Sequence, residues 1–84
     1  MKILIVDDEP DVIKVITMSF QMHQPAWEVV SAPDGPEALE QMEGERPDVV
    51  LLDVGLPEMS GFEVLRRIRL FSDAPVIMLT VKAD

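Results

Sequence analysis

Carboxylates follow two of the most apolar segments of this 84-residue chain. Asp7 and Asp8 come directly after the run 3–6, ILIV. Asp53 comes directly after the run 49–52, VVLL. Runs this short and this rich in branched aliphatic residues are typical of strands in a parallel sheet that is buried on both faces. If these two strands are neighbours, the three carboxylates meet at the edge of the sheet where ligands bind in open α/β folds.

Three carboxylates at such a site need a cation, because their mutual repulsion otherwise keeps one of them protonated. A site made only of oxygen atoms, without His or Cys, suits a hard ion such as Mg²⁺, which keeps several waters and binds phosphoryl oxygens. The metal also screens the charge on Asp53, so that a phosphoryl group can approach its carboxylate. The pattern therefore makes Asp53 a candidate nucleophile for covalent phosphoryl transfer.

A simpler interpretation is that these acidic residues only cap the helices that follow the strands. This interpretation stays open for Asp8 and Glu9, because the helix predicted to begin at Pro10 needs a cap. It is weak for the set as a whole, because Asp53 precedes a loop and not a helix start.

The elements that would position the carboxylates alternate between strands and helices. Apolar runs predict buried strands at 3–6, 49–52 and 76–79, and a strand with more solvent contact at 27–31. Stretches of helical period lie between them, which gives the order β-α-β-α-β-α-β. Connections this short predict right-handed crossovers onto a parallel sheet.

The first helix is predicted between Pro10 and Pro25. Pro10 suits the first helical position, and Pro25 prevents the helix from continuing. The spacing predicts one buried face on this helix, made of Val12, Val15, Ile16, Ser19 and Phe20.

Capping signals predict where the other two helices begin. Asp34 with Glu37 three residues later is a variant capping box, and we expect that helix to end at Gly44. Ser60 with Glu63 is a full S-x-x-E box. The apolar face of this third helix is predicted to be Gly61, Val64, Leu65 and Ile68.

Composition excludes several classes of function. The chain has 48% hydrophobic and 27% charged residues and is long enough for one small folded domain. Its net charge of −9 repels phosphate backbones and anionic lipid, so we expect no contact of this chain with nucleic acid or membrane. The absence of cysteine and of a long apolar N-terminal segment leads us to expect a cytoplasmic protein.

Three stretches, ILIVDDEP, PDVVLLDVGLPEMSGFEVLRRIR and PVIMLT, occur in this order with SAPDGPEALE between the first two. Together they resemble the receiver domain of two-component response regulators, over Lys2 to about Thr80. The resemblance implies a flavodoxin-like open parallel sheet with strand order 2-1-3-4. It also implies that residues 1–84 form a partial receiver domain.

The resemblance implies a role for each site residue. Asp53 would be the phosphoacceptor, receiving a phosphoryl group from a sensor histidine kinase, a phosphotransfer protein or a small acyl phosphate. Asp7, Asp8 and Asp53 would bind Mg²⁺ together with the backbone carbonyl of Gly55. Thr80 would be the switch hydroxyl that hydrogen-bonds a phosphoryl oxygen, although a threonine at a strand end also has a purely structural interpretation.

The loop between the third strand and the third helix would shape the pocket. It runs from Leu56 to Gly61. Pro57 would make it rigid, and Gly61 would allow close approach of backbone at the helix start.

The chain departs from the family at its C-terminal side. A complete receiver domain continues with a helix, a fifth strand that ends in a lysine, and a last helix, and none of these occurs before Asp84. The missing lysine would place a fixed cation at the phosphoryl oxygens and stabilise the charge that develops there during transfer, so we expect phosphorylation to be impaired. We also expect a homo-oligomer that forms through the exposed fourth strand or by exchange of an element.

Rival functions remain beside the phosphoacceptor module, which we expect to be a signalling domain and not an enzyme. The main alternative is a truncated receiver fragment that self-associates as a scaffold without phosphoryl transfer. A Mg²⁺-dependent phosphatase with an aspartyl nucleophile is weaker, because Gly55 stands where such enzymes usually carry a second acid. A flavin carrier is weaker still, because no phosphate-cradling loop follows the first strand.

Overall fold

Strands and helices alternate along the chain, as the sequence predicts. The computed structural model describes residues 1–79, so Thr80 lies outside the described residues. The elements are β1 (Lys2–Val6), α1 (Pro10–His23), β2 (Glu28–Ala32), α2 (Gly35–Glu45), β3 (Val49–Asp53), α3 (Gly61–Ile68) and β4 (Val76–Leu79). No helix in this range is long and apolar enough to cross a membrane.

The four strands form one parallel sheet in the order β2-β1-β3-β4, which confirms the predicted topology. In the register of β1 and β3, Val6 pairs with Leu52. In the register of β3 and β4, Asp53 pairs with Leu79. The carboxyl ends of β1 and β3 therefore lie side by side at one edge of the sheet.

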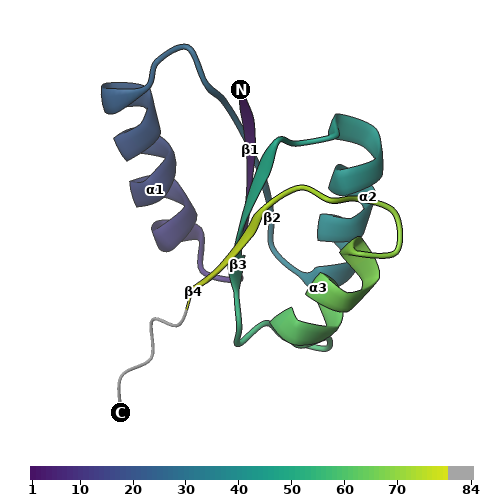
Figure 1. Ribbon diagram of the computed structural model, residues 1–84. Coiled ribbons are helices and arrows are strands. Elements are labelled where there is room, and N and C mark those ends of the chain that lie inside the picture. Colours follow the sequence, from purple (N-terminus) through teal and green to yellow (C-terminus); the bar gives the residue numbers. More distant parts are fainter. Residues whose placement is uncertain (80–84) are drawn as a thin grey trace.

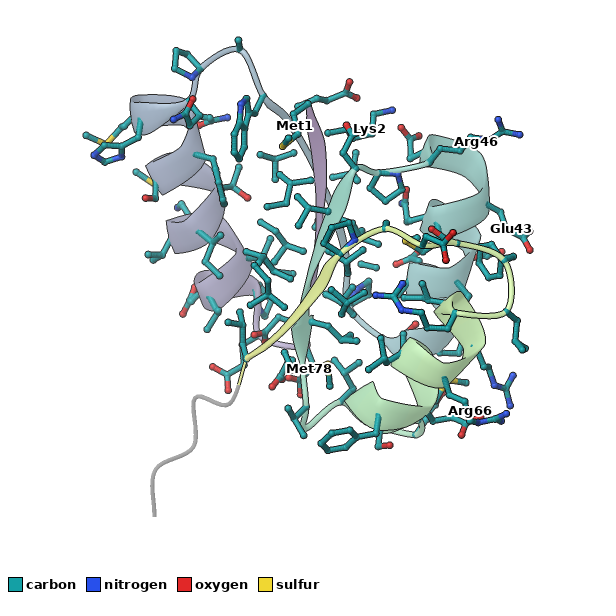
Figure 2. All side chains as sticks on the ribbon, viewed as in Figure 1. Met1, Lys2, Glu43, Arg46, Arg66 and Met78 are labelled. Carbon is teal, nitrogen blue, oxygen red and sulfur yellow. The ribbon has the colours of Figure 1, made fainter. Side chains whose placement is uncertain are left out.

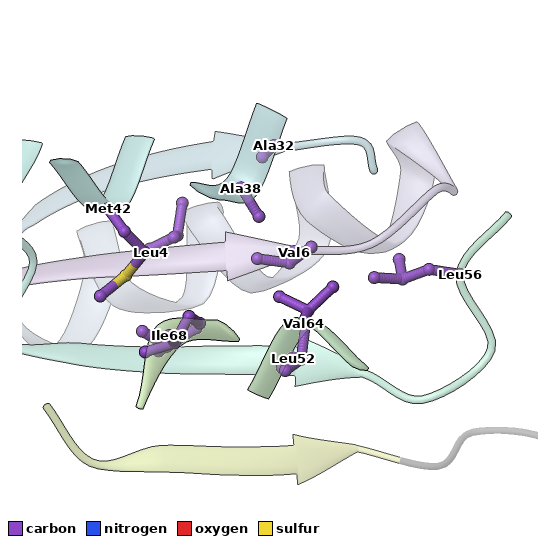
Figure 3. Close-up of a cluster of buried hydrophobic side chains, with 10 residues drawn as sticks. Leu4, Val6, Ala32, Ala38, Met42, Leu52, Leu56, Val64 and Ile68 are labelled. Carbon is purple, nitrogen blue, oxygen red and sulfur yellow. The ribbon is translucent and has the colours of Figure 1, made fainter. Parts of the chain in front are cut away.

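Helices cover both faces of the sheet. Figure 1 shows α1 on one face and α2 and α3 on the other. The core between the sheet and the α2–α3 layer is fully apolar (Figure 3). Its members are Leu4, Val6, Ala32, Ala38, Met42, Val50, Leu52, Leu56, Val64 and Ile68. Burial of these side chains is the main force that holds β1 and β3 at the centre of the sheet.

The predicted helix starts are confirmed. The Asp34 carboxylate accepts a hydrogen bond from the Glu37 N–H at 2.9 Å, and the Ser60 hydroxyl accepts one from the Glu63 N–H at 3.3 Å. The predicted end of α2 at Gly44 is wrong. The helix continues to Glu45 and ends because Arg46 turns into the left-handed conformation, with φ 49°.

The predicted buried face of α1 is wrong in part. Val15 is 66% exposed, and Ser19 is exposed as well. The half-buried face contains Ile13 and Thr17 in their place, beside the correctly predicted residues Val12, Ile16 and Phe20. The helical spacing fits two overlapping faces of α1, one that includes Val15 and Ser19 and one that includes Ile13 and Thr17. The sequence pattern alone does not say which of the two faces packs on the sheet.

Strand β4 has only β3 as a hydrogen-bonded neighbour within residues 1–79. Its side chain Ile77 is 50% exposed, whereas Val50 on the partner strand is completely buried. The expectation that β4 is an exposed edge therefore agrees with the described part of the sheet. Strand β2 begins at Glu28 and ends at Ala32, one residue later than predicted.

Candidate functional site

Asp7, Asp8 and Asp53 come together as the sequence predicts. Asp53 is the last residue of β3, and Asp7 directly follows β1 on the neighbouring strand. One carboxylate oxygen from each of the three residues lies within 4.8 Å of the others. The apolar strands thus deliver three carboxylates to one small volume.

Burial makes this cluster electrostatically demanding. Asp7 is 3% exposed and Asp53 is 5% exposed, while Asp8 is exposed. Loss of hydration raises the pKa of Asp7 above its ordinary value, and the neighbouring charges of Asp53 and Asp8 raise it further. A hydrogen bond from the Glu9 N–H, at 2.9 Å, partly opposes this rise.

The donor set fits a hard divalent cation. All three side chains offer carboxylate oxygens, and two of them are held in place by burial. A cation at this position would relieve the repulsion that raises the pKa of Asp7. Mg²⁺ prefers such oxygen ligands and retains waters that phosphoryl oxygens replace. Asp7, Asp8 and Asp53 are therefore the residues that would hold it.

The capping interpretation does not account for these residues. Glu9 occupies the N-cap position of α1, but its side chain makes no capping hydrogen bond. The carboxylate of Asp7 instead accepts the Glu9 N–H, which fixes the orientation of Asp7 at the site. Helix α1 begins without a side-chain cap, with Pro10 at its first position.

The loop after β3 holds the Asp53 side chain. The N–H of Gly55 donates to Oδ1 of Asp53 at 3.2 Å. The role of the Gly55 carbonyl as a metal ligand stays a prediction. Within the same loop, the Met59 N–H reaches the Pro57 carbonyl at 2.6 Å, and Glu58 between them has φ 65°. The sequence gives no signal for this strained turn, because Glu rarely adopts such a conformation.

A separate cavity lies at the opposite end of the sheet. Its volume is about 450 Å³, and it is lined by Met42, Glu43, Arg46, Pro47, Phe71 and Ser72. Figure 2 shows Arg46 and Glu43 at the end of α2, far from Met78 near the carboxyl ends of the strands. None of the three clustered carboxylates lines this cavity, so it is not part of the candidate site.

Two solved receiver domains superpose closely on this chain. The N-terminal domain of a response regulator receiver protein from Methanoculleus marisnigri superposes with a TM-score of 0.89 at 36% identity, over 99% of this chain and 68% of that one. The BeF3-activated N-terminal receiver domain of RstA from Klebsiella pneumoniae gives 0.89 at 34% identity, over 100% of this chain and 70% of that one.

Curated relatives agree with the structural match. The alkaline phosphatase synthesis transcriptional regulatory protein PhoP of Bacillus subtilis is 39% identical over 99% of this chain and 34% of its own length. The transcriptional regulatory protein KdpE of Mycobacterium tuberculosis is 38% identical over 98% and 35%. The chain thus spans about a third of the length of these relatives. The response regulator receiver domain model matches residues 3–84, and the chain belongs to this family.

Proposed function

We propose that this chain accepts a phosphoryl group on Asp53 from a phosphohistidine of a sensor kinase or phosphotransfer protein, with Mg²⁺ bound beside it. The observation that carries this proposal is the convergence of Asp7, Asp8 and Asp53 within 4.8 Å at the carboxyl ends of two adjacent parallel strands. A buried aspartate among other acids has little structural value on its own, because its charge is poorly solvated.

The transfer is an in-line displacement at phosphorus. Oδ1 of Asp53 is held by the Gly55 N–H, so we assign the attack to Oδ2. The new Oδ2–P bond forms while the bond from phosphorus to the donor imidazole nitrogen breaks, and the nitrogen keeps the electron pair. With a small acyl phosphate, a P–O bond breaks instead and a carboxylate leaves.

Mg²⁺, when bound, neutralises charge on the carboxylates and on the phosphoryl oxygens. Asp7 and Asp8 would hold it, with one oxygen of Asp53 and the carbonyl of Gly55 as further proposed ligands. Burial of Asp7 and Asp53 excludes water from part of the site, which strengthens each of these interactions.

Thr80 completes the proposed set as the switch residue. It directly follows β4 in the sequence, and β4 ends beside Asp53, which pairs with Leu79. A hydroxyl at this place in the chain is suited to donate to a phosphoryl oxygen. Thr80→Ser keeps the hydroxyl and should keep the conformational response to phosphorylation, whereas Thr80→Ala should remove it. The response is measured as the change in backbone amide chemical shifts when Asp53 is phosphorylated.

Intact mass spectrometry tests the proposed function. The chain is incubated with Mg²⁺ and a small acyl phosphate, and the fraction carrying one phosphoryl group is measured over time. Asp53→Asn should show no adduct. Asp73→Asn, a matched change at an exposed aspartate outside the cluster, should behave like the parent. Absence of any adduct on the folded parent at all donor concentrations contradicts the proposal.

The chain spans about a third of its curated relatives, so the output of the signal is a separate question. Because its net charge of −9 repels phosphate backbones, we expect no DNA contact from this chain itself. The cytoplasmic location stays a proposal, based on the cysteine-free sequence.

We also propose self-association through β4. Its outer edge has no neighbour within residues 1–79, and Ile77 offers apolar surface beside that edge. Two copies related by a two-fold axis would pair their β4 strands antiparallel, and exchange of an element between copies is the alternative route.

Sedimentation at micromolar concentration should show a dimer. Ile77→Lys should weaken it, whereas Leu70→Lys, at an exposed apolar side chain outside the sheet, should not. A parent that sediments as a monomer contradicts self-association.

A further inference from the structure

Gly61, the first residue of α3, lies directly against the backbone of Asp53. A Cβ atom at position 61 would lie 2.5 Å from the Asp53 carbonyl oxygen and 2.9 Å from Cα of Val54. Both distances are far inside ordinary van der Waals contact. Any side chain at position 61 must therefore displace the backbone from which the Asp53 carboxylate projects.

A hydrogen bond fixes the same contact. The Gly61 N–H donates to the Val54 carbonyl at 3.0 Å, which closes the loop between β3 and α3. Ser60 fixes the start of α3, because its hydroxyl accepts the Glu63 N–H and its carbonyl accepts the Val64 N–H. The first turn of α3 is thus rigid where it supports the strand end.

A second glycine, Gly35, also packs closely beside this loop, but against side chains and not against the Asp53 backbone. A Cβ atom at Gly35, in the first turn of α2, would lie 2.9 Å from Sδ of Met59 and 3.0 Å from Cγ2 of Val64. These neighbours, which include Cβ of Met59 at 3.0 Å, are all side-chain atoms. The flexible Met59 sulfur can move away, while Met59 Cβ and Val64 must give by a few tenths of an ångström, so the crowding falls on these two side chains and not directly on the Asp53 backbone.

We propose that Gly61 is a positioning residue for phosphoryl transfer, because its bare Cα and its N–H hold the Asp53–Val54 backbone in the place from which the carboxylate reaches phosphorus. This inference rests on the proposed function of Asp53. The close approach excludes every side chain, so the requirement is for glycine itself and not for a small residue.

The test compares two Gly→Ala changes that flank the same loop. Gly61→Ala crowds the backbone of Asp53, and Gly35→Ala crowds only side chains. We expect the initial rate of adduct formation with Mg²⁺ and a small acyl phosphate to fall about 10- to 100-fold in Gly61→Ala, the scale of an ångström-sized misplacement. Gly35→Ala should stay within about threefold of the parent. Rates are referred to the folded fraction, measured by circular dichroism, so that simple unfolding is not counted.

A second substitution can stabilise Gly61→Ala against unfolding. Gly44 is exposed near the end of α2, and a Cβ there meets no atom within 4 Å, so Gly44→Ala provides a stabilised background for Gly61→Ala. Ser60→Ala serves as an independent probe at an exposed position. It should speed hydrogen exchange of the Gly61 amide and lower the rate of phosphorylation together.

The outcomes separate this inference from the proposed function. If the folded parent forms no adduct, the proposed function is wrong. The positioning role is then tested by the NMR chemical shift of the Gly55 amide, which donates a hydrogen bond to Asp53. That chemical shift should change in Gly61→Ala and not in Gly35→Ala. Parental rates in folded Gly61→Ala overturn the positioning role. If that variant does not fold in either background, faster Gly61 exchange in Ser60→Ala at an unchanged phosphorylation rate overturns it.

Discussion

Asp7 and Asp53 bring carboxylate oxygens within 4.8 Å of each other although their side chains are only 3% and 5% exposed. The register explains the pairing, because Val6 lies opposite Leu52 and the next residue in the chain after each of them is the aspartate. Burying two like charges opposes folding, and a bound cation would offset that penalty.

Asp7→Asn should stabilise the metal-free protein at neutral pH. Burial raises the pKa of Asp7 in the folded state, so the ionised form disfavours folding. The penalty is absent below the ordinary pKa of 3.8, grows as pH rises from there through the folded pKa, and is complete above the folded pKa. We expect a gain on the order of 1 kcal/mol in urea unfolding at pH 7. The gain should shrink towards pH 3. A less stable variant at pH 7 contradicts this account of the cluster.

Mg²⁺ should reverse that order of stability. A ligand that binds only the folded state stabilises it by about 2.7 kcal/mol at 100 times its dissociation constant. Asp7→Asn lacks one charged ligand, so we expect its Mg²⁺ affinity to fall by at least about tenfold, or about 1.4 kcal/mol. Thermal unfolding across a Mg²⁺ titration measures both effects. Asp73→Asn should titrate like the parent, and equal titrations of Asp7→Asn and the parent contradict the assigned metal site.

Much of the site was predictable because short-range rules determine it. Apolar runs define β1 and β3, and the residue after each run must emerge at the carboxyl edge of the sheet. The caps of Asp34 and Ser60 depend on residues three positions away, so they are visible in the sequence.

The features that escaped prediction are set by tertiary packing. The sheet selects the arc of α1 that contains Ile13 and leaves Val15 exposed, although both arcs satisfy the same spacing. Glu58 and Arg46 adopt positive φ angles without the Gly or Asn that usually signals them. The close approach of backbone at Gly61 was predicted, but its partner, the backbone of Asp53, is set by the way α3 packs against the end of β3, which no local pattern reports.

Glu63 should make a pH-dependent contribution to stability. Its carboxylate accepts hydrogen bonds from Arg66 and Arg67, which lower its pKa to about 2. Figure 2 shows Arg66 on the outward side of α3, so salt should weaken the interaction. The contribution is present above the ordinary pKa of 4.5 and is lost as pH falls towards 2.

Glu63→Gln should therefore unfold at lower urea concentration than the parent at pH 7 and at the same concentration near pH 2. Urea titrations at several pH values and salt concentrations measure this difference. Glu40→Gln, at an exposed position on α2, is the control and should show little pH dependence. A constant difference between Glu63→Gln and the parent across the pH range would mean that the arginine pairs do not stabilise the fold.

Arg46→Gly should stabilise the protein. Arg46 ends α2 with φ 49° and ψ 60°, a left-handed conformation that costs an ordinary residue about 1 to 2 kcal/mol. Glycine removes most of that strain but gives the unfolded chain more freedom, so we expect a net gain of about 0.5 to 1 kcal/mol in urea unfolding. The matched control is Glu40→Gly, the same kind of change inside α2, which should destabilise by about 1 kcal/mol. If both substitutions destabilise equally, the strain at Arg46 is not what limits the end of α2.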